Sequence, residues 1–394
     1  MMRFEYGVVG AGVVGSAIAY HLARRGHRVV LAERGLAGSL GATSYRGGII
    51  RGFDTHLSTA QLCTEGLEHF LNWEALGYPG SRPSDHIGFL YLLDQAKQSS
   101  AQHVIENLGA ASGIRFLSRR ELRRYAPFVP DTHAGLAVLD TKGGLADPTG
   151  TTLALCEGLR RSDATVLEHA TLSAISAAPG GGWRLWFGAG SVLVERLVLA
   201  TGASTRAWLP SLPIVSRAVS LVCVESPDRI ALPVYDELSG AYLRPAGPGT
   251  FYCGRTALEQ EIDGTSADVP SSVYEQIHAR ACATLGGGTT SRIVHGMSGC
   301  DAYTPTGLPY LDFVDANRTL YVATGFSGRG FKYALWAGDA VAVDLCGERT
   351  GASGRVIDLS AYRLPDEALL DGQIDVNQLP RTSRGISLNE RAFK

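Results

Sequence analysis

The order of elements at the N-terminus constrains the fold of this chain more than any other feature. A short apolar run over residues 4–9 precedes the glycine motif of residues 10–15. Apolar residues then recur at helical spacing up to Gly26, and a second apolar run over residues 29–32 ends at Glu33. This succession predicts a strand, a tight turn, a helix and a parallel strand, which is the unit that binds a dinucleotide.

Each part of this unit has a physical role. Gly10 permits the tight turn, Gly12 lets the backbone approach a pyrophosphate, and Gly15 lets the helix pack closely on the strand. The free N–H groups at the start of the helix favour phosphate. Glu33 suits hydrogen bonds to the hydroxyls of a ribose. The motif alone does not distinguish FAD from NAD.

Two later segments favour FAD. Residues 196–203 and 320–332 each read as an apolar strand that runs into a glycine-containing turn, and an amphipathic helix follows the second turn from Tyr333 to Leu345. An isoalloxazine needs more surrounding backbone than a simple NAD-binding domain supplies, and such turns provide it. We therefore expect FAD, and an NAD-linked dehydrogenase is the alternative.

Composition sets the wider limits. A length of 394 residues predicts two domains, and a hydrophobic fraction of 45% supports a large core. A net charge of −2 argues against nucleic-acid binding, and no apolar run is long enough to span a membrane. The seven cysteines include no C-x-x-C pair, which argues against a metal site or a disulfide framework. Because the N-terminus makes a poor signal peptide, we predict a cytoplasmic protein with reduced thiols.

Further motifs follow along the chain. Residues 41–51, 143–148, 200–202, 242–245, 302–305 and 325–332 read G-A-T-S-Y-R-G-G-I-I-R, G-G-L-A-D-P, A-T-G, Y-L-R-P, A-Y-T-P and G-F-S-G-R-G-F-K. In this order they resemble the FAD-dependent amine and amino-acid oxidases of the D-amino-acid oxidase superfamily, especially the branch of monomeric sarcosine oxidase and N-methyltryptophan oxidase. The resemblance extends over residues 5–346.

This resemblance implies an α/β plus α+β fold. A discontinuous Rossmann-like domain would bind FAD, a second domain with an antiparallel sheet would cover the substrate, and an extended tail would follow. The expected ranges are 1–85, 147–215 and 301–365 for the FAD domain, 86–146 and 216–300 for the substrate domain, and 366–394 for the tail. Strand-like runs over residues 219–225, 241–244 and 250–253 agree with an antiparallel sheet.

The resemblance also implies that Arg51 and Lys332 bind the carboxylate of the substrate. An arginine makes two charge-assisted hydrogen bonds to a carboxylate, and a lysine adds a point charge. Only four of the 36 basic residues are lysines, and Lys332 lies near the start of a predicted helix, where the helix dipole disfavours a cation. Such a lysine indicates an anionic ligand. Binding by the carboxylate would fix which C–H bond faces flavin N5.

The predicted FAD-binding residues come from the glycine motif, the acid and its neighbour, the segment before Arg51, and the later turns. They are Gly10, Gly12, Val13, Val14, Gly15, Glu33, Arg34, Thr43, Ser44, Arg46, Thr201, Gly202, Cys300, Gly325, Gly328, Gly330, Phe331 and Lys332.

Two departures from the family concern the chemistry of the flavin. The family attaches its flavin to a cysteine at the position that Asp301 occupies here, and Cys300 lies one residue earlier, so covalent attachment through Cys300 stays open. The family also carries a lysine over the flavin that assists the reaction with oxygen. This chain has none there, and Arg255 and Tyr252 are the candidates to replace it.

A third departure concerns the substrate pocket. Ser44 and Gly48 stand where the family has a histidine and an arginine, which predicts a larger or less basic pocket. Aromatic side chains are expected to line it. The candidates are Tyr45, Tyr242, Tyr252 and Trp336.

We therefore predict an FAD-dependent oxidation of a C–N bond in a small amino or imino acid, with oxygen or another acceptor taking the electrons. Three alternatives stay open: a flavin dehydrogenase that uses a non-oxygen acceptor, a hydroxy-acid oxidase, and a non-catalytic flavin-binding subunit. No metal, nucleic acid or membrane is expected as a partner.

Overall fold

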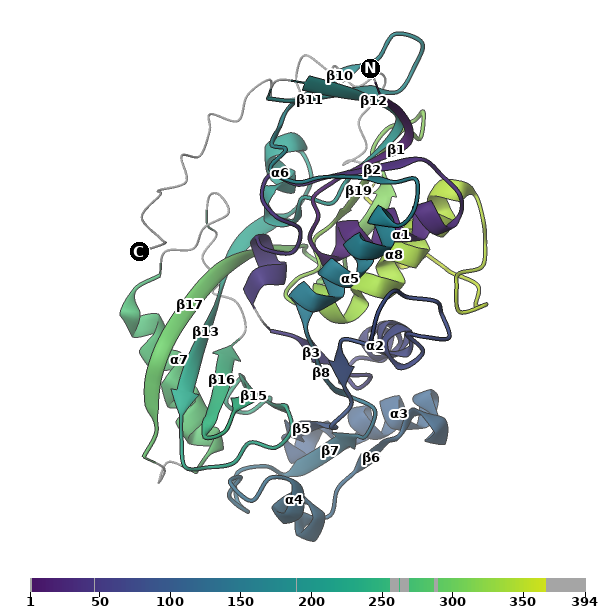
Figure 1. Ribbon diagram of the computed structural model, residues 1–394. Coiled ribbons are helices and arrows are strands. Elements are labelled where there is room, and N and C mark those ends of the chain that lie inside the picture. Colours follow the sequence, from purple (N-terminus) through teal and green to yellow (C-terminus); the bar gives the residue numbers. More distant parts are fainter. Residues whose placement is uncertain are drawn as a thin grey trace.

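The computed structural model describes residues 2–45, 47–188, 190–255, 262, 269–286 and 290–365, and these fold around two large β-sheets (Figure 1). The predicted tail and Arg46 lie outside the described residues. Within the described ranges, no helix is both long and apolar enough to cross a membrane.

The first sheet is built from stretches that are far apart in the sequence. Among the described residues its order is β10-β11-β12-β1-β2-β9, and β19 pairs with both β12 and β18. The central strands β12, β1, β2 and β9 are parallel, as expected of a Rossmann-like sheet. The bounds are β1 Arg3–Val9, β2 Val29–Ala32, β9 Thr165–Leu167, β10 Leu172–Ala177, β11 Trp183–Phe187, β12 Gly190–Leu199, β18 Tyr310–Phe313 and β19 Leu320–Thr324.

Helices cover one face of this sheet and pack tightly on one another. The predicted helix after the glycine motif is confirmed as α1, and Gly26 follows its end with a φ of +86°. Ala17 of α1 lies against Gly338 of α8, where an added Cβ would be 2.5 Å from the Ala17 Cβ. α8 begins at Gly330, before the predicted Tyr333, so Lys332 lies in its first turn. The bounds are α1 Val13–Arg24, α2 Leu57–Leu71, α5 Pro148–Arg160 and α8 Gly330–Cys346.

The other face packs on a smaller hydrophobic cluster. Trp183 of β11 and Trp208 of the short helix α6 (Thr205–Trp208) belong to it, together with Val9 and Leu199 from the centre of the sheet. The parallel strands are therefore buried on both faces, which explains why they read as continuous apolar runs.

The second sheet has the order β17-β13-β16-β15-β14-β5-β7-β6 among the described residues. Its pairings are antiparallel, as predicted, except that β14 is parallel to β5. These two strands come from separate stretches of the chain, so no hairpin fixes their direction. The bounds are β5 Phe89–Leu93, β6 Ile114–Phe116, β7 Leu136–Asp140, β13 Val215–Glu225, β14 Val234–Asp236, β15 Ala241–Gly247, β16 Thr250–Arg255 and β17 Arg292–Tyr303.

The two faces of the second sheet differ in character. One face packs on α7 (Ser271–Thr284) through a hydrophobic core that includes Leu243, Phe251 and Ile277. Alternate residues point the other way, and on β14, β15 and β16 these are Tyr235, Tyr242, Arg244 and Tyr252. The second group forms a polar, aromatic face.

Short elements connect the two sheets. Figure 1 shows β3 and β8 between the helices of the first sheet and the strands of the second. These two strands pair, and β8 also pairs with β4. The remaining bounds are β3 Ile49–Ile50, β4 Ser84–Asp85, β8 Gly144–Ala146, α3 Gln98–Leu108, α4 Arg119–Tyr125, η1 Gly41–Tyr45, η2 Gln95–Lys97, η3 Ala110–Ser112, η4 Gly202–Ser204 and η5 Ser360–Tyr362.

Candidate active site

The glycine motif forms a turn that only glycine fits at two positions. Gly10 has a φ of +104°, and an added Cβ would lie 2.4 Å from the Ala200 carbonyl oxygen. A Cβ on Gly15 would lie 1.9 Å from the Gly10 carbonyl oxygen. Strand and helix therefore approach as closely as their backbones allow, as the role given to Gly15 requires.

The start of α1 offers N–H groups to an anion. Gly12 caps the helix without a side-chain hydrogen bond, and the Val13 N–H donates to Thr43 Oγ1 over 3.1 Å. The N–H groups of Val14 and Gly15 belong to the first turn, which has no carbonyl partner inside the helix. The carboxylate of Glu33 accepts from the Ala11 N–H over 2.8 Å, which fixes its position at the end of β2. These residues fit the pyrophosphate and ribose of FAD.

The later predicted turns lie beside this motif. Thr201 and Gly202 follow β12, and Thr324 Oγ1 at the end of β19 donates to the Gly202 carbonyl over 3.3 Å. Gly325 and Gly328 both have a φ of +75°, and an added Cβ would lie 2.3 Å from Thr304 Cγ2 at Gly325 and 2.8 Å from the Tyr303 hydroxyl at Gly328, so the turn before α8 favours glycine at both positions.

The turn before α8 is fastened to β17. Asp301 is at the family's cysteine position, and its Oδ2 accepts from the Gly328 N–H over 2.8 Å. Burial raises the pKa of Asp301 to about 6. A Cβ on Gly299 would lie 1.6 Å from the ring of Tyr45, so Tyr45 covers the same face of β17. Because side chains alternate along a strand, Cys300 points to the opposite face from Asp301.

Three other predicted FAD-binding residues have different surroundings. Arg34 is exposed, and the hydroxyl of Ser44 donates to the Gly41 carbonyl over 2.9 Å. Phe331 packs against Phe70 of α2, with ring centroids 5.5 Å apart, so its side chain is part of the helical core.

Arg51 lies directly after β3, and its side chain, which is 11% exposed, packs among aromatic rings. Its guanidinium lies over Phe89 and Tyr91, with its Cζ 5.4 and 5.5 Å from the ring centroids. Nη2 donates to Asp54 Oδ2 over 2.8 Å. Nη1 is buried and has no hydrogen-bond partner within the described residues. Burial alone would raise the pKa of Asp54, but the charge of Arg51 outweighs it and lowers that pKa.

Lys332 is a buried cation close to Arg51. It is 9% exposed, and its Nζ has no hydrogen bond or ion pair in the described part of the chain. Burial and the charge of Arg51 lower its pKa to about 7. Cys63 of α2 is buried within electrostatic reach of both cations, and its thiol lies 3.8 Å from the Tyr333 hydroxyl. The fold thus brings two cations from opposite ends of the chain to one buried place.

The two candidates on β16 are on opposite faces of the sheet. Tyr252 lies on the polar face, and Arg255 lies on the α7 face, where Nη1 donates to Gln276 over 3.3 Å. A different arginine reaches the polar face: Arg244 of β15 lies over Tyr252, with its Cζ 5.9 Å from the ring centroid.

The surroundings of Gly48 therefore contain a basic group, Arg244, where the sequence predicted a larger or less basic pocket. A Cβ on Gly48 would lie 3.4 Å from Nη2 of Arg244. Of the predicted pocket aromatics, Tyr242 is on the polar face beside Gly254, and Trp336 instead packs on Tyr362 in the core, with ring centroids 5.5 Å apart. Trp336 lies four residues after Lys332 and therefore on the same side of α8, and its place in the substrate pocket stays a prediction.

Sequence reasoning also missed residues that surround Arg51. None of these residues belongs to one of the sequence motifs. They are Asp54, Cys63, Tyr91 and Tyr235. The rings of Tyr91 and Tyr235 meet edge to face at 4.9 Å, and both come from strands of the polar face. Asp54 is three residues after Arg51, a spacing that gave a signal for an ion pair.

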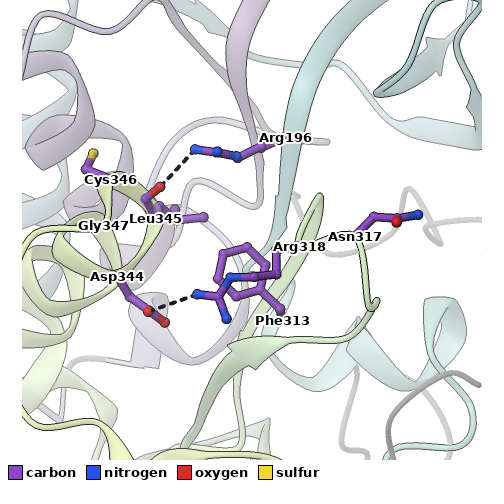
Figure 2. Close-up of a pocket in the computed structure, with 8 residues that line it drawn as sticks. All are labelled: Arg196, Phe313, Asn317, Arg318, Asp344, Leu345, Cys346 and Gly347. Atoms are coloured by element: carbon purple, nitrogen blue, oxygen red, sulfur yellow. Dashed lines mark hydrogen bonds and ion pairs between the residues drawn. The ribbon is translucent and has the colours of Figure 1, made fainter.

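A surface pocket lies at the other end of α8. Its volume is about 360 Å³. Figure 2 shows its lining residues beside the C-terminal end of the helix, where Arg318 pairs with Asp344 and Arg196 donates to the Leu345 carbonyl. At 1.5 Å per residue, it is about 20 Å along the helix from Lys332. It contains none of the predicted FAD-binding or substrate-binding residues.

Comparisons with known proteins agree with this geometry. Residues 5–343 match the model of the family described as FAD dependent oxidoreductase. The chain is 25% identical over 354 residues to the glycine oxidase of Geobacillus kaustophilus (strain HTA426), covering 86% of this chain and 92% of that protein.

Solved structures share the fold. The L-proline dehydrogenase of P. horikoshii has a TM-score of 0.78 and 23% identity, covering 88% of this chain and 94% of that one. The glycine oxidase of Geobacillus kaustophilus has a TM-score of 0.76 and 23% identity, covering 93% and 99%.

Proposed function

The chain belongs to the family of FAD-dependent oxidoreductases, and on this premise we propose that it oxidises the C–N bond of a small amino or imino acid. Arg51 and Lys332 bind the carboxylate of the substrate. The first sheet and its helices hold FAD, and the polar face of the second sheet covers the substrate, with the domain ranges expected from the sequence.

One observation carries this proposal: two buried cations lie together, and Arg51 has an unused donor. Arg51 Nη1 is buried without a hydrogen-bond partner among the described residues, and Lys332, which is 9% exposed, lies within electrostatic reach of Arg51. An unpaired buried donor is costly, so such a pair favours an anion between its members. Asp54 balances only one of the two charges. The anion that fits is a single carboxylate.

The side chains position the substrate rather than act as strong acids or bases. FAD, when bound, would supply the acceptor for the hydride that leaves the carbon next to the substrate nitrogen. Arg51, which is held by Asp54 and two aromatic rings, supplies a rigid fork for one side of the carboxylate. Lys332 supplies a charge from the start of α8. Fixing the carboxylate in this way leaves the amine free and directs one C–H bond towards the cofactor.

The electron acceptor distinguishes two candidates within this function. The sequence has no lysine between Lys142 and Lys332, so the second sheet carries no lysine on its polar face. This favours, as the second candidate, a dehydrogenase that passes electrons to an acceptor other than oxygen. Comparing the rates at which oxygen and a redox dye reoxidise the reduced flavin separates the two.

The first test concerns Arg51 and Lys332, which together we call the carboxylate clamp. Arg51→Ala and Lys332→Met should each raise KM strongly while FAD stays bound, with a loss of about 2–5 kcal/mol in kcat/KM for a desolvated charge pair. Arg255→Met, on the far face of the second sheet, is the matched control and should leave KM unchanged. Unaltered kinetics in the first two variants would refute the clamp.

A further inference from the structure

Asp140 is a fully buried carboxylate that serves no ion pair in the described structure. It ends β7 with 0% exposure, and its oxygens accept only backbone N–H groups. Oδ1 accepts from Lys142 over 3.0 Å and from Gly143 over 2.9 Å, and Oδ2 accepts from Gly52 over 2.6 Å. A buried carboxylate with this many donors fixes the backbone around it.

The segment that Asp140 fixes directly follows Arg51. Gly52 donates to Asp140, and Asp54, two residues further on, forms the ion pair with Arg51. The backbone of Asp140 also pairs with Phe89 of β5, the ring beneath the Arg51 guanidinium. Asp140 therefore fixes both the backbone that follows Arg51 and the position of Phe89, whose ring packs against the Arg51 guanidinium.

We propose that Asp140 is a positioning residue, which holds Arg51 in the orientation that binds the substrate carboxylate and so rests on the proposed function. The Arg51 side chain is long. If the backbone around it were loose, the guanidinium could turn towards solvent or pair with Asp54 through both terminal nitrogens. Neither orientation would bind the substrate carboxylate. A displacement of about 1 Å at a binding group is enough to cost as much as 100-fold in rate. Asp140 prevents this displacement without touching the substrate.

Asp140→Asn is the sharpest variant. An asparagine amide has only one oxygen. We expect this oxygen to take the place of Oδ1, because Oδ1 accepts two hydrogen bonds, from the N–H groups of Lys142 and Gly143. The amide NH2 then faces the Gly52 N–H, and donor meets donor. The substitution thus releases the Arg51 segment selectively. Asp140→Ser, which is smaller and keeps one acceptor, is the second variant.

The chain offers a matched control in Asp236. This carboxylate is also 0% exposed and lies in the same sheet, but on the α7 face, where it binds Thr284 Oγ1 over 2.7 Å and His133 Nε2 over 2.6 Å. Asp236→Asn should lower the melting temperature in the same manner as Asp140→Asn. It should leave the carboxylate site intact.

The experiment titrates the FAD-loaded protein with acetate and follows the visible flavin spectrum. We expect Asp140→Asn and Asp140→Ser to weaken acetate binding about 10- to 100-fold, with KM raised more than kcat is lowered, and Asp236→Asn to bind acetate as the wild type does. In an Arg51→Met background, Asp140→Asn should weaken acetate binding no further, because both act through one group.

The outcomes separate this inference from the proposed function. If Arg51→Met itself binds acetate normally, the carboxylate clamp is wrong. If Arg51→Met loses acetate but both Asp140 variants bind it normally, or lose it additively with Arg51→Met, the positioning role is wrong. If neither Asp140 variant folds with FAD while Asp236→Asn does, Asp140 supports the whole fold, and this also overturns the positioning role.

Discussion

Arg51 and Lys332 differ in whether a neighbouring carboxylate stabilises their positive charge. Arg51 has a carboxylate partner in Asp54 at 2.8 Å and two aromatic rings beneath it, so it stays charged and fixed. Lys332 has no such partner within the described residues, and burial together with Arg51 lowers its pKa to about 7. The carboxylate clamp therefore has one permanent cation and one that titrates near neutral pH.

The titration of Lys332 predicts a pH dependence of ligand binding. Protonated Lys332 attracts a carboxylate, so binding is strong below pH 7 and weakens as the pH rises through the pKa of Lys332. Acetate stays ionised throughout this range, because carboxyl pKa values lie near 4. Above pH 7 the dissociation constant of acetate should rise by about tenfold per pH unit until binding to neutral lysine takes over.

Lys332→Met supplies the control for that measurement. The variant should bind acetate weakly and with no pH dependence between pH 6.5 and 9. Without ligand it should be more stable than the wild type near neutral pH, because the wild type must bury a charged amine. A pH dependence that survives in Lys332→Met would assign the titration to another group.

At the scale of elements, α8 connects three parts of the molecule: the turn of residues 325–329 before it, the carboxylate clamp of Arg51 and Lys332, and the helical core. Its first turn carries Lys332, and a Cβ on Gly66 of α2 would lie only 1.9 Å from the Lys332 carbonyl oxygen. Further along, Asp339 forms an ion pair over 3.0 Å with Arg25, the residue that follows α1. The position of Lys332 therefore depends on how closely α1 and α2 approach α8.

Gly66→Ala tests that dependence. The added methyl forces α2 away from the backbone of Lys332, because a carbonyl oxygen has no room to move inside a helix. We expect a loss of about 1–3 kcal/mol in the free energy of unfolding, together with weaker acetate binding. Gly190→Ala, where an added Cβ meets nothing within 4 Å, should change neither. Normal stability and acetate binding in Gly66→Ala would contradict the close contact.

A buried polar chain joins the same three helices. His21 Nδ1 faces Asp339 Oδ1 at 3.3 Å, so this nitrogen carries the proton and Nε2 accepts from the Tyr78 hydroxyl over 2.9 Å. The Tyr78 oxygen in turn accepts from His69 Nδ1 over 2.7 Å. Burial lowers the pKa of His21 to about 3 and that of His69 to about 4, so both are neutral in the folded protein.

These histidines predict that acid destabilises the fold. In the unfolded chain both take up a proton below about pH 6.5, whereas the folded chain resists protonation until about pH 3–4, so stability falls as the pH drops below 6.5. Tyr78→Phe leaves two buried nitrogens without partners and should cost about 1–3 kcal/mol at neutral pH. Tyr20→Phe, which loses one bond to the Gly77 carbonyl, should cost less. Chemical denaturation across this pH range measures both.

At the scale of the whole molecule, the sequence predicted what local motifs encode. The family and the FAD cofactor, expected from the order of the motifs, are confirmed by the match over residues 5–343. The Rossmann-like first sheet is confirmed, and the strands predicted over residues 219–225, 241–244 and 250–253 are confirmed as parts of β13, β15 and β16. These features depend on short motif spacings and on apolar periodicity, and both can be recognised in one sequence alone.

What the sequence could not predict depends on pairing between distant strands. Arg244 and Arg255 are close in sequence and equally basic, but the register of β15 against β16 puts Arg244 on the polar face and Arg255 on the α7 face. Asp140 reads as an ordinary turn residue in D-T-K-G-G until β7 brings it to Gly52. The domain boundaries and the roles of the site residues stay predictions.

The most direct test of the central claim is anaerobic reduction of the FAD-loaded protein by a panel of cyclic, N-methyl and primary amino acids, with hydroxy acids alongside. We predict that at least one amino acid bleaches the visible flavin absorption rapidly, that hydroxy acids do not, and that Arg51→Met and Lys332→Met need far higher amino-acid concentrations. Bleaching by hydroxy acids alone, or equal concentrations for wild type and both variants, would contradict the account.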